Sequence, residues 1–408
     1  MSVPIAFPSL FGTVEMAPRD PILGLTEAFI ADPRPTKVNL GVGVYQGDDG
    51  KVPLLESVRT AERARLEALP ARGYLPIDGL ASYNQLVQRL VFGDDSPLLA
   101  EGRVVTIETL GGTGALRVGA DLLRRLLPDA TTYLSDPSWE NHRALFETAG
   151  FPVDTYPYYD PVTFGVRFAN MKERLTQLAP GSIVVLHACC HNPTGADLTA
   201  VEWQEVVEIV RARGLVAFLD MAYQGFADGL GADAMAPRLF ADAGLSFLLA
   251  TSFSKSFSLY GERVGALSLV TASDREAACV LSQIKRLVRT SYSNPPTHGA
   301  AVVASILSDA KLRESWEAEL AGMRDRIRGM RLSLLEKLRA RGVPTDFSFL
   351  LHQRGMFSYT GISAAQVDRL RADYGIYAVS SGRICVAALN SRNVDYVAEA
   401  LAAVLKSS

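Results

Sequence analysis

Short runs of apolar residues recur through the middle of the chain and alternate with stretches in which apolar residues recur at helical spacing. Most of these runs are continuous rather than alternating, which is the pattern of strands that are buried on both faces of a sheet. We predict strands at residues 104–110, 132–135, 183–187, 215–219, 247–250 and 266–270. Strands that alternate with helices are typical of an α/β fold, with a mainly parallel central sheet flanked by helices.

Clear start and stop signals bound the predicted helices. Thr199 and Glu202 have the spacing of a capping box, and Gly214 is placed to end the helix that this box begins. A second amphipathic helix is predicted at residues 114–127. Residues 309–341 carry apolar side chains at helical spacing, which predicts a helix long enough to run from one domain into another.

The C-terminal part of the chain has a different pattern. Residues 347–351, 356–359 and 384–388 predict short strands around a final helix, which indicates a smaller α+β domain. The chain has 408 residues, and a single hydrophobic core stops growing near ~250–300 residues. We therefore expect two domains.

The composition narrows the possible function classes. Hydrophobic residues make up 48% of the chain, charged residues 21%, and the formal net charge is -3, so neither nucleic acid nor an anionic membrane is an expected partner. The proline-containing segment 1–21 lacks the basic and apolar regions of a signal peptide and predicts an extended arm. No apolar run approaches the ~18 residues that a membrane-spanning helix needs.

Four cysteines are present, at Cys189, Cys190, Cys279 and Cys385. The adjacent pair would form a disulfide only with severe strain, so we expect reduced thiols and a cytoplasmic location. Neighbouring residues on a strand point to opposite faces, so Cys189, Cys190 and His191 do not have the spacing of a metal site. We expect no metal.

Polar residues gather where four of the predicted strands end. In open α/β sheets, ligands bind in the crevice beyond the carboxyl ends of the strands, so one site could contain them all. These residues are Asn192, Asp220, Tyr223, Lys255 and the turn Gly111-Gly112-Thr113-Gly114.

Each of these features has a functional and a purely structural interpretation. The glycine turn favours an anion at a helix N-terminus but also suits a tight turn, and it lacks the Gly-Lys-Ser/Thr ending of a nucleotide P-loop. Lys255 is either a desolvated nucleophile that forms a Schiff base or an exposed loop lysine. Asp220 is either the partner of a pyridinium nitrogen or a turn former, and Arg263 binds either a phosphate or a surface carboxylate.

Three longer motifs occur in order along the chain: Asn192-Pro-Thr-Gly, Asp220-Met-Ala-Tyr223-Gln-Gly-Phe and Ser252-Phe-Ser-Lys255-Ser-Phe-Ser-Leu-Tyr-Gly-Glu-Arg263-Val-Gly. With these motifs the chain resembles the class I aminotransferases of the aspartate and aromatic-amino-acid branch, which have the fold type I of transferases dependent on pyridoxal 5′-phosphate (PLP). The resemblance extends from Asp20-Pro-Ile-Leu-Gly-Leu to Ser381-Gly-Arg383, and several motifs in order are more specific than one.

The resemblance implies that PLP is the cofactor and that Lys255 holds it as a Schiff base and moves a proton during catalysis. Asp220 would pair with the pyridine nitrogen and His142 would support it, while Tyr223 and Asn192 would bind the 3′-oxygen of the ring. The other implied cofactor contacts are Gly112, Thr113, Ser252 and Arg263 at the phosphate, Trp139 on the ring, and Tyr74 at the phosphate of a neighbouring subunit.

The resemblance also implies how the substrate binds. Arg383, Asn192 and the backbone near Gly43 would hold its α-carboxylate, with Trp139 beside it, and a guanidinium fork suits that carboxylate. Arg289 would pair with the second carboxylate of a dicarboxylic substrate, although it also suits the C-terminal end of a helix dipole. The resembled enzymes are homodimers, so Arg289 would reach the site of the partner.

In these enzymes the smaller domain combines both ends of the chain. The implied division is an arm at 1–14, which would lie across the partner subunit, a small domain at 15–51 and 322–408, and a large PLP-binding domain at 52–321.

The expected reaction moves the amino group of phenylalanine, tyrosine and aspartate to 2-oxoglutarate, in a ping-pong exchange between PLP and its amino form. Stretches such as Asp136-Pro-Ser-Trp139-Glu-Asn-His142 are more similar to bacterial aromatic-amino-acid (tyrosine) aminotransferases, whereas Tyr292-Ser-Asn-Pro-Pro-Thr-His-Gly is closer to the aspartate enzymes. The alternatives are a mainly aspartate aminotransferase, another PLP reaction on this fold, and a transcription regulator with an aminotransferase-like domain. The regulator would need a DNA-binding segment, for which only a short proline-containing arm is left.

Overall fold

The computed structural model describes residues 9–17 and 23–406. The first eight residues of the predicted N-terminal arm therefore lie outside the described residues. Residues 9–17 form a turn and irregular backbone, and all of them are exposed. None of the helices within the described ranges combines the length and the apolar character that crossing a bilayer requires.

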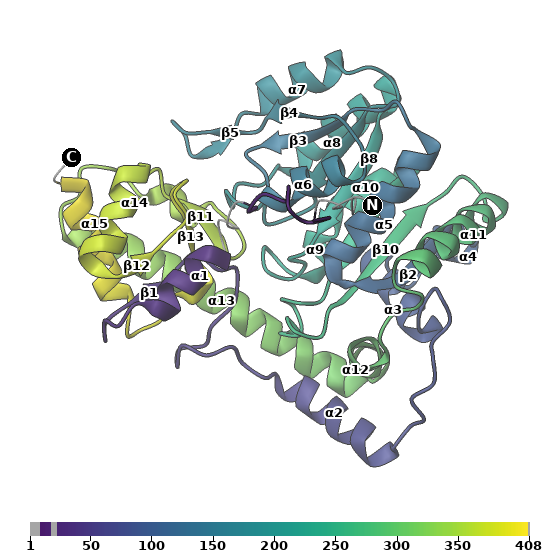
Figure 1. Ribbon diagram of the computed structural model, residues 1–408, viewed down its shortest axis with the longest axis horizontal. Coiled ribbons are helices and arrows are strands. Elements are labelled where there is room, and N and C mark those ends of the chain that lie inside the picture. Colours follow the sequence, from purple (N-terminus) through teal and green to yellow (C-terminus); the bar gives the residue numbers. More distant parts are fainter. Residues whose placement is uncertain (1–8, 18–22, 407–408) are drawn as a thin grey trace, which may run out of the picture.

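A seven-stranded sheet forms the centre of the larger part of the molecule (Figure 1). Its strands are β2 (Val104–Leu110), β3 (Thr132–Asp136), β4 (Val153–Pro157), β7 (Ile183–His187), β8 (Val216–Met221), β9 (Phe247–Ser252) and β10 (Val264–Val270). They lie in the order β2-β10-β9-β8-β7-β3-β4, and only the two pairings of β10 are antiparallel. The predicted α/β fold with a mainly parallel sheet is confirmed, and all six predicted strands are present.

Helices cover both faces of this sheet. On one face lie α5 (Gly111–Leu126), α6 (Glu140–Thr148) and α11 (Asp274–Ser291), and on the other lie α3 (Ala81–Phe92), α7 (Phe168–Gln177), α8 (Ala200–Arg213), α10 (Met235–Asp242) and α12 (Thr297–Ser308). In β7, Ile183 and Val185 pack in the core on the face covered by α5, α6 and α11. Val184 and Leu186 pack in the core on the opposite face. Burial on both faces explains why the strand sequences are continuously apolar.

Strand β4 has no counterpart among the predictions. It lies at the edge of the sheet, where only Tyr156 of its five residues is buried. An edge strand with exposed polar residues does not produce the continuous apolar run that identified the central strands.

The predicted helix ends are largely confirmed. The Thr199 hydroxyl accepts a hydrogen bond from the Glu202 N–H at 3.3 Å, the Glu202 carboxylate accepts one from the Thr199 N–H at 2.7 Å, and Gly214 ends α8 with a positive φ of 61°. Helix α5 begins at Gly111, three residues earlier than predicted. The glycine turn is therefore the first turn of the helix itself.

A second group of elements combines the two ends of the chain (purple and yellow in Figure 1). It contains α1 (Leu23–Ala31), β1 (Val38–Asn39), β11 (Phe357–Tyr359), α14 (Ala364–Tyr374), β12 (Ile376–Tyr377), β13 (Arg383–Cys385) and α15 (Val394–Lys406). Strand β1 pairs with β12, and β11 pairs with β13. Other elements are α2 (Glu56–Ala68), α4 (Pro97–Ala100), α9 (Leu230–Asp233) and the hairpin of β5 (Tyr159–Asp160) and β6 (Gly165–Val166).

One long helix, α13 (Ala310–Ala340), connects the two groups (Figure 1). It packs against α2 and α12 in the larger part and against α15 in the smaller part. It passes without a break through residue 322, so the predicted domain boundaries at residues 52 and 322 stay a prediction.

Two of the strands predicted in the C-terminal part are wrong or too long. Ser348–Leu351 forms a 3-10 helix, and residues 386–388 of the predicted strand 384–388 also form a 3-10 turn after β13. Phe349 and Leu350 are buried. Burial explains the short apolar run equally well, and such a run by itself does not distinguish a strand from a helical turn.

Candidate active site

A cavity of about 270 Å³ opens beyond the carboxyl ends of β2, β7, β8 and β9, at the side that faces the smaller group of elements. Eleven of the residues named from the sequence line it. They are Gly43, Gly112, Thr113, Trp139, Asn192, Asp220, Tyr223, Ser252, Lys255, Arg263 and Arg383. The prediction that the strand ends form one site is therefore confirmed as geometry.

One end of the cavity has the properties of an anion site. Gly112 and Thr113 belong to the first turn of α5, where backbone N–H groups have no partner within the helix. The Arg263 guanidinium donates to the Ser254 hydroxyl at 3.4 Å and to the Tyr260 carbonyl at 3.0 Å. Among the described residues no carboxylate lies within ion-pair distance of Arg263, so the alternative of a surface ion pair is wrong.

The glycines of this turn are required by close packing. Gly111 has a φ of +66°, and a Cβ atom there would lie 2.5 Å from the Arg263 Nη2 atom. A Cβ at Gly112 would lie 3.2 Å from the Cβ of Ser252. A side chain at Gly111 would displace the Arg263 guanidinium. The place of Arg263 therefore depends on glycine at this position of the turn.

Lys255 lies three residues beyond β9, in the wall of the cavity. Its Nζ atom is 4.9 Å from the centre of the Tyr223 ring. Burial lowers the pKa of Lys255 to about 8, although the nearby charge of Asp220 acts in the opposite direction. A lysine with this pKa is partly neutral near neutral pH and is therefore a competent nucleophile and base. The alternative of an exposed loop lysine is wrong.

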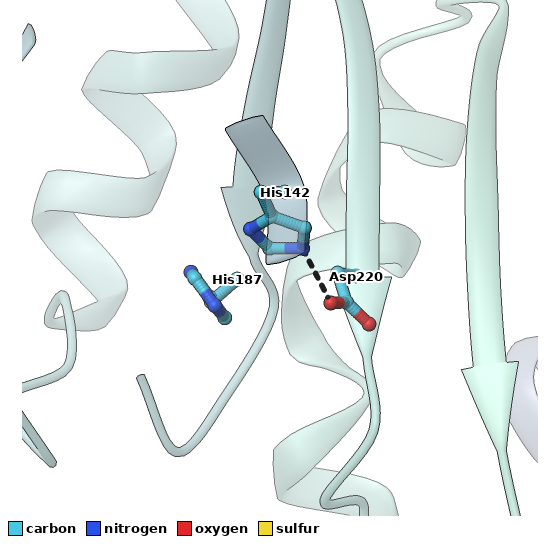
Figure 2. A group of neighbouring side chains, drawn as sticks. All are labelled: His142, His187 and Asp220. Carbon is cyan, nitrogen blue, oxygen red and sulfur yellow. Dashed lines mark hydrogen bonds and ion pairs between the residues drawn. The ribbon is translucent and has the colours of Figure 1, made fainter. Parts of the chain in front are cut away.

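Asp220 is the penultimate residue of β8, and His142 binds its carboxylate (Figure 2). The His142 Nε2 and Asp220 Oδ2 atoms are 2.9 Å apart, and the Nδ1 atom of the same ring is 2.9 Å from the Ser138 hydroxyl. Burial alone would raise the pKa of Asp220, but the hydrogen bond and the charges around it, from His142 first, hold this pKa below its ordinary value. Asp220 therefore remains an anion in a buried site.

His187, at the end of β7, also lines the cavity but was not named from the sequence. Its ring lies between those of His142 and His191, with centroids 4.9 Å and 4.4 Å away. Both of its ring nitrogens are buried without a hydrogen-bond partner, and burial holds its pKa well below the usual range. A neutral imidazole with two unpartnered nitrogens is a polar group that still needs a ligand or water.

Two groups of residues place potential metal ligands within 4.8 Å of one another: His142, His187 and Asp220 (Figure 2), and Cys189, Cys190 and Asp233. In the first group, His142 and Asp220 are already hydrogen-bonded to each other. In the second, the Asp233 carboxylate already accepts three backbone N–H groups. We assign no metal to either group, and the expected absence of a metal stays a prediction.

The other end of the cavity contains a buried guanidinium. Arg383 is 1% exposed, donates to the Asn192 side-chain oxygen at 3.2 Å and to the Gly41 carbonyl at 2.7 Å, and lies 4.5 Å above the Phe357 ring. Its Nε atom is buried without a partner, and among the described residues it has no carboxylate in ion-pair range. A buried cation without a counterion requires an anionic ligand, so this end of the cavity suits a carboxylate.

Apart from His142, which lies behind the cavity wall and binds Asp220, two predicted site residues lie outside this cavity, Tyr74 and Arg289. Both line a separate, open hollow of about 840 Å³, which also contains Leu110 from the end of β2. Tyr74 is 96% exposed, and Arg289 is exposed with its Nη1 atom donating to the Ser293 hydroxyl at 2.5 Å. Within one chain these two side chains do not contribute to the cavity.

The sequence missed part of the cavity wall. The additional lining residues are Leu116, His187, Ala222, Ser254, Tyr260 and Phe357. Ser254 and Tyr260 lie within the motif around Lys255, so the motif itself was a signal. Phe357 had no such signal in the sequence. Its ring lies next to Gly43, where an added Cβ atom would lie 2.6 Å from it, and only the folded chain reveals this proximity.

Comparisons with known proteins agree with this geometry. The family described as aminotransferase class I and II matches residues 35–401 of the chain. An aspartate aminotransferase of Pseudomonas aeruginosa is 63% identical and covers 97% of this chain and 100% of its own length. An aromatic-amino-acid aminotransferase of Escherichia coli is 53% identical with the same coverage.

A solved structure extends the similarity to three dimensions. The crystal structure of an aromatic-amino-acid aminotransferase from Burkholderia pseudomallei, covalently bound to pyridoxal phosphate, has a TM-score of 0.96 and 66% identity to the chain. The match covers 98% of this chain and 100% of that one.

Proposed function

Because the chain belongs to the class I and II aminotransferases, we propose that it moves the amino group of phenylalanine, tyrosine and aspartate to 2-oxoglutarate. It is an aminotransferase, and its cofactor is pyridoxal 5′-phosphate. The observation that carries the substrate proposal is the buried Arg383, a cation without a counterion at the end of the cavity opposite the anion site. Both kinds of amino acid carry the α-carboxylate that this guanidinium requires.

The residues of the cavity suit PLP at each point where the cofactor is polar. Arg263 without a carboxylate partner and the first turn of α5 suit its phosphate, and the ionised Asp220 suits a protonated pyridine nitrogen. Lys255, with its lowered pKa, is the amine that would hold the aldehyde group. Bound PLP supplies an electron sink that stabilises negative charge at the substrate Cα.

The chain's own side chains do the remaining work. In the proposed mechanism, Arg383 and Asn192 hold the α-carboxylate and thereby orient the Cα–H bond towards the cofactor. Lys255 then removes the proton from the substrate Cα as a neutral amine, and as an ammonium group it would donate this proton to C4′ of the cofactor. Asp220 remains an anion because His142 donates to it, and Trp139 covers the reacting groups.

Tyr223 and Asn192 are the proposed partners of the 3′-oxygen of the cofactor ring, and Gly112, Thr113 and Ser252 of its phosphate. Both Tyr223 and Asn192 are 5% exposed and lie in the cavity wall. Burial raises the pKa of Tyr223 above its usual range, so its hydroxyl stays protonated and can donate to that oxygen.

We propose further that the active enzyme is a homodimer in which Tyr74 and Arg289 act in the site of the partner. Their open hollow and their exposure support this, since neither side chain lines the cavity of its own chain. Arg289 would then bind the second carboxylate of aspartate and 2-oxoglutarate. A cytoplasmic location is proposed on the four free cysteines, three of which are buried.

A mainly aspartate aminotransferase is the second candidate, favoured by the 63% identity to the P. aeruginosa enzyme of that name. The deciding experiment measures kcat/KM for phenylalanine, tyrosine and aspartate, each with 2-oxoglutarate. Values within ~10-fold of each other support dual specificity. A preference for aspartate of ~100-fold or more selects the second candidate, and no transfer with any of them contradicts both.

A further inference from the structure

Tyr260 lines the cavity and makes hydrogen bonds that lead towards both of its ends. Its carbonyl accepts the hydrogen bond from Arg263 at 3.0 Å, at the anion end. Its side-chain hydroxyl accepts a hydrogen bond from the backbone N–H of Tyr45 at 2.9 Å. Tyr45 belongs to the N-terminal segment 41–46, which reaches the carboxylate end of the cavity.

Segment 41–46 carries two parts of the carboxylate end. The Gly41 carbonyl accepts from Arg383 at 2.7 Å, and Gly43 lines the cavity in close contact with the Phe357 ring. A Cβ at Gly43 would lie 2.6 Å from that ring, so the segment has little freedom to shift towards it. Tyr45 lies four residues beyond Gly41 in the same segment, so we expect a displacement of Tyr45 to shift the carbonyl that orients Arg383.

The segment is fixed on its other side by Arg326 of α13. The Arg326 Nε atom donates to the Tyr45 hydroxyl at 2.7 Å, and the guanidinium lies 4.6 Å above the Tyr45 ring. The same guanidinium donates to the carbonyls of Leu389 at 2.7 Å, Ala387 at 2.9 Å, and Gln46. Tyr45 is thus held to the connecting helix α13 through its side chain and to the larger group through its backbone N–H.

We propose that Tyr260 is a positioning residue that couples the anion end of the cavity to the carboxylate end. Its hydroxyl holds the Tyr45 backbone and so sets the place of the Gly41 carbonyl, of Gly43 and, through them, of Arg383. The anion end and the carboxylate end of the cavity then shift together. This role rests on the proposed function for its effect on substrates, but the hydrogen bond itself does not depend on it.

The test uses the full-length, PLP-loaded protein with Tyr260→Phe, which removes only the hydroxyl. Hydrogen exchange is measured without substrate, so that its result does not depend on any reaction. We expect the backbone N–H of Tyr45 to exchange faster, by about 2- to 12-fold, the factor that one net hydrogen bond corresponds to. Tyr396→Phe is the matched control, because it also loses one hydroxyl hydrogen bond, to the Tyr374 carbonyl at 2.6 Å, in the smaller group of elements.

Steady-state kinetics of the same variants separate positioning from other roles. In Tyr260→Phe, KM for amino acids and for 2-oxoglutarate should rise by about 2- to 12-fold, with kcat changed less than KM and the dissociation constant of PLP unchanged. Tyr45→Phe, which loses the bond from Arg326, should raise KM in the same direction, and the double variant should show less than the product of the two effects.

Several outcomes would overturn the proposal. Unchanged Tyr45 exchange in Tyr260→Phe removes the coupling, whatever the kinetics show. A weaker hold on PLP makes Tyr260 a cofactor contact instead. If no amino acid is transaminated by the unmodified protein, the proposed function fails, but the exchange experiment still decides whether Tyr260 holds the segment.

Discussion

The enclosed cavity and the open hollow differ most clearly in their two arginines. Arg383 is 1% exposed and is fixed by the Asn192 amide, the Gly41 carbonyl and the Phe357 ring. Arg289 is exposed, and its guanidinium donates a hydrogen bond to Ser293, four residues further along the chain. One arginine is oriented by distant parts of its own chain, and the other only by its immediate neighbourhood.

The difference shows which parts of the site one chain completes by itself. A guanidinium that is already fixed loses little conformational entropy when the substrate binds. An exposed arginine must be ordered on binding, and the entropy cost of that ordering weakens binding. The hollow also contains the 96% exposed Tyr74 beside apolar residues such as Leu110 and Ile77. Its incompleteness is what the proposed homodimer explains.

The largest expected effect comes from the cavity and concerns Lys255. Lys255→Ala should lower kcat by about 10⁴-fold, because it removes the residue that we propose as both the covalent anchor of the cofactor and the base that moves the proton. The visible absorbance of the covalently held cofactor should disappear as well. Lys172→Ala, at an exposed lysine that pairs with Glu205 at 2.6 Å, is the control and should leave both unchanged. Retained activity in Lys255→Ala would remove the basis of the proposed mechanism.

The next effect tests the buried arginine directly. Arg383→Ala should lower kcat/KM by about 10³-fold for phenylalanine, tyrosine and aspartate alike, since all three lose the same charge-assisted hydrogen bonds. Kinetics with the three amino acids and 2-oxoglutarate provide the measurement. A loss confined to aspartate would show that Arg383 serves the second carboxylate, and the roles of the two arginines would have to be exchanged.

A third prediction concerns the hollow and separates the two regions by subunit. Arg289→Ala should lower kcat/KM by about 10²-fold for aspartate and leave phenylalanine nearly unaffected, because only aspartate loses a carboxylate partner. Equal amounts of Lys255→Ala and Arg289→Ala subunits are then unfolded together and refolded, so that half of the dimers contain one subunit of each kind. If the arginine acts in the partner's site, the mixed dimers contain one intact site each, and about a quarter of the original aspartate activity should return.

The control for this experiment is each variant unfolded and refolded alone. If Arg289 acts within its own chain, the mixed dimers contain no intact site. The aspartate activity of the mixture then stays at the sum of the two separate variants, which would contradict the shared site.

The same contrast explains what the sequence predicted well. The polar residues at strand ends, such as Asp220 and Lys255, were predicted to meet because parallel strands place their carboxyl ends at one edge of a sheet. The confirmed strands are those that are buried on both faces, which leaves a continuous apolar run, and they include β2 at the edge of the sheet. These features depend on local pattern and on a general rule of sheet topology.

The features that the sequence did not predict depend on contacts between distant segments. The side chain of His187 was not distinguished from an ordinary core residue, because its two unpartnered nitrogens are visible only once His142 and His191 are packed around it. Residues 347–351 were predicted as a strand, but Ser348–Leu351 is a 3-10 helix, because burial gives both structures the same apolar run. Tyr260 lies inside the most specific motif, yet its bond to Tyr45 spans 215 positions of the chain.

The smallest expected effect lies behind the cavity wall, at His142. His142→Ala removes the 2.9 Å hydrogen bond to Asp220, the largest of the influences that oppose burial and hold the pKa of this carboxyl low. The pKa of Asp220 should therefore rise in the variant. A carboxylate whose pKa is lowered in the folded protein stabilises the fold at pH values above its unfolded pKa. This stabilisation is lost as the pH falls through the folded pKa. In His142→Ala that loss should move to higher pH, so the acid side of the kcat/KM profile should shift upwards, with an activity loss of about 10-fold at neutral pH. His352→Ala, at an exposed histidine, is the control and should leave the profile unchanged. An equal loss at every pH would mean that His142 only supports packing and does not keep Asp220 ionised.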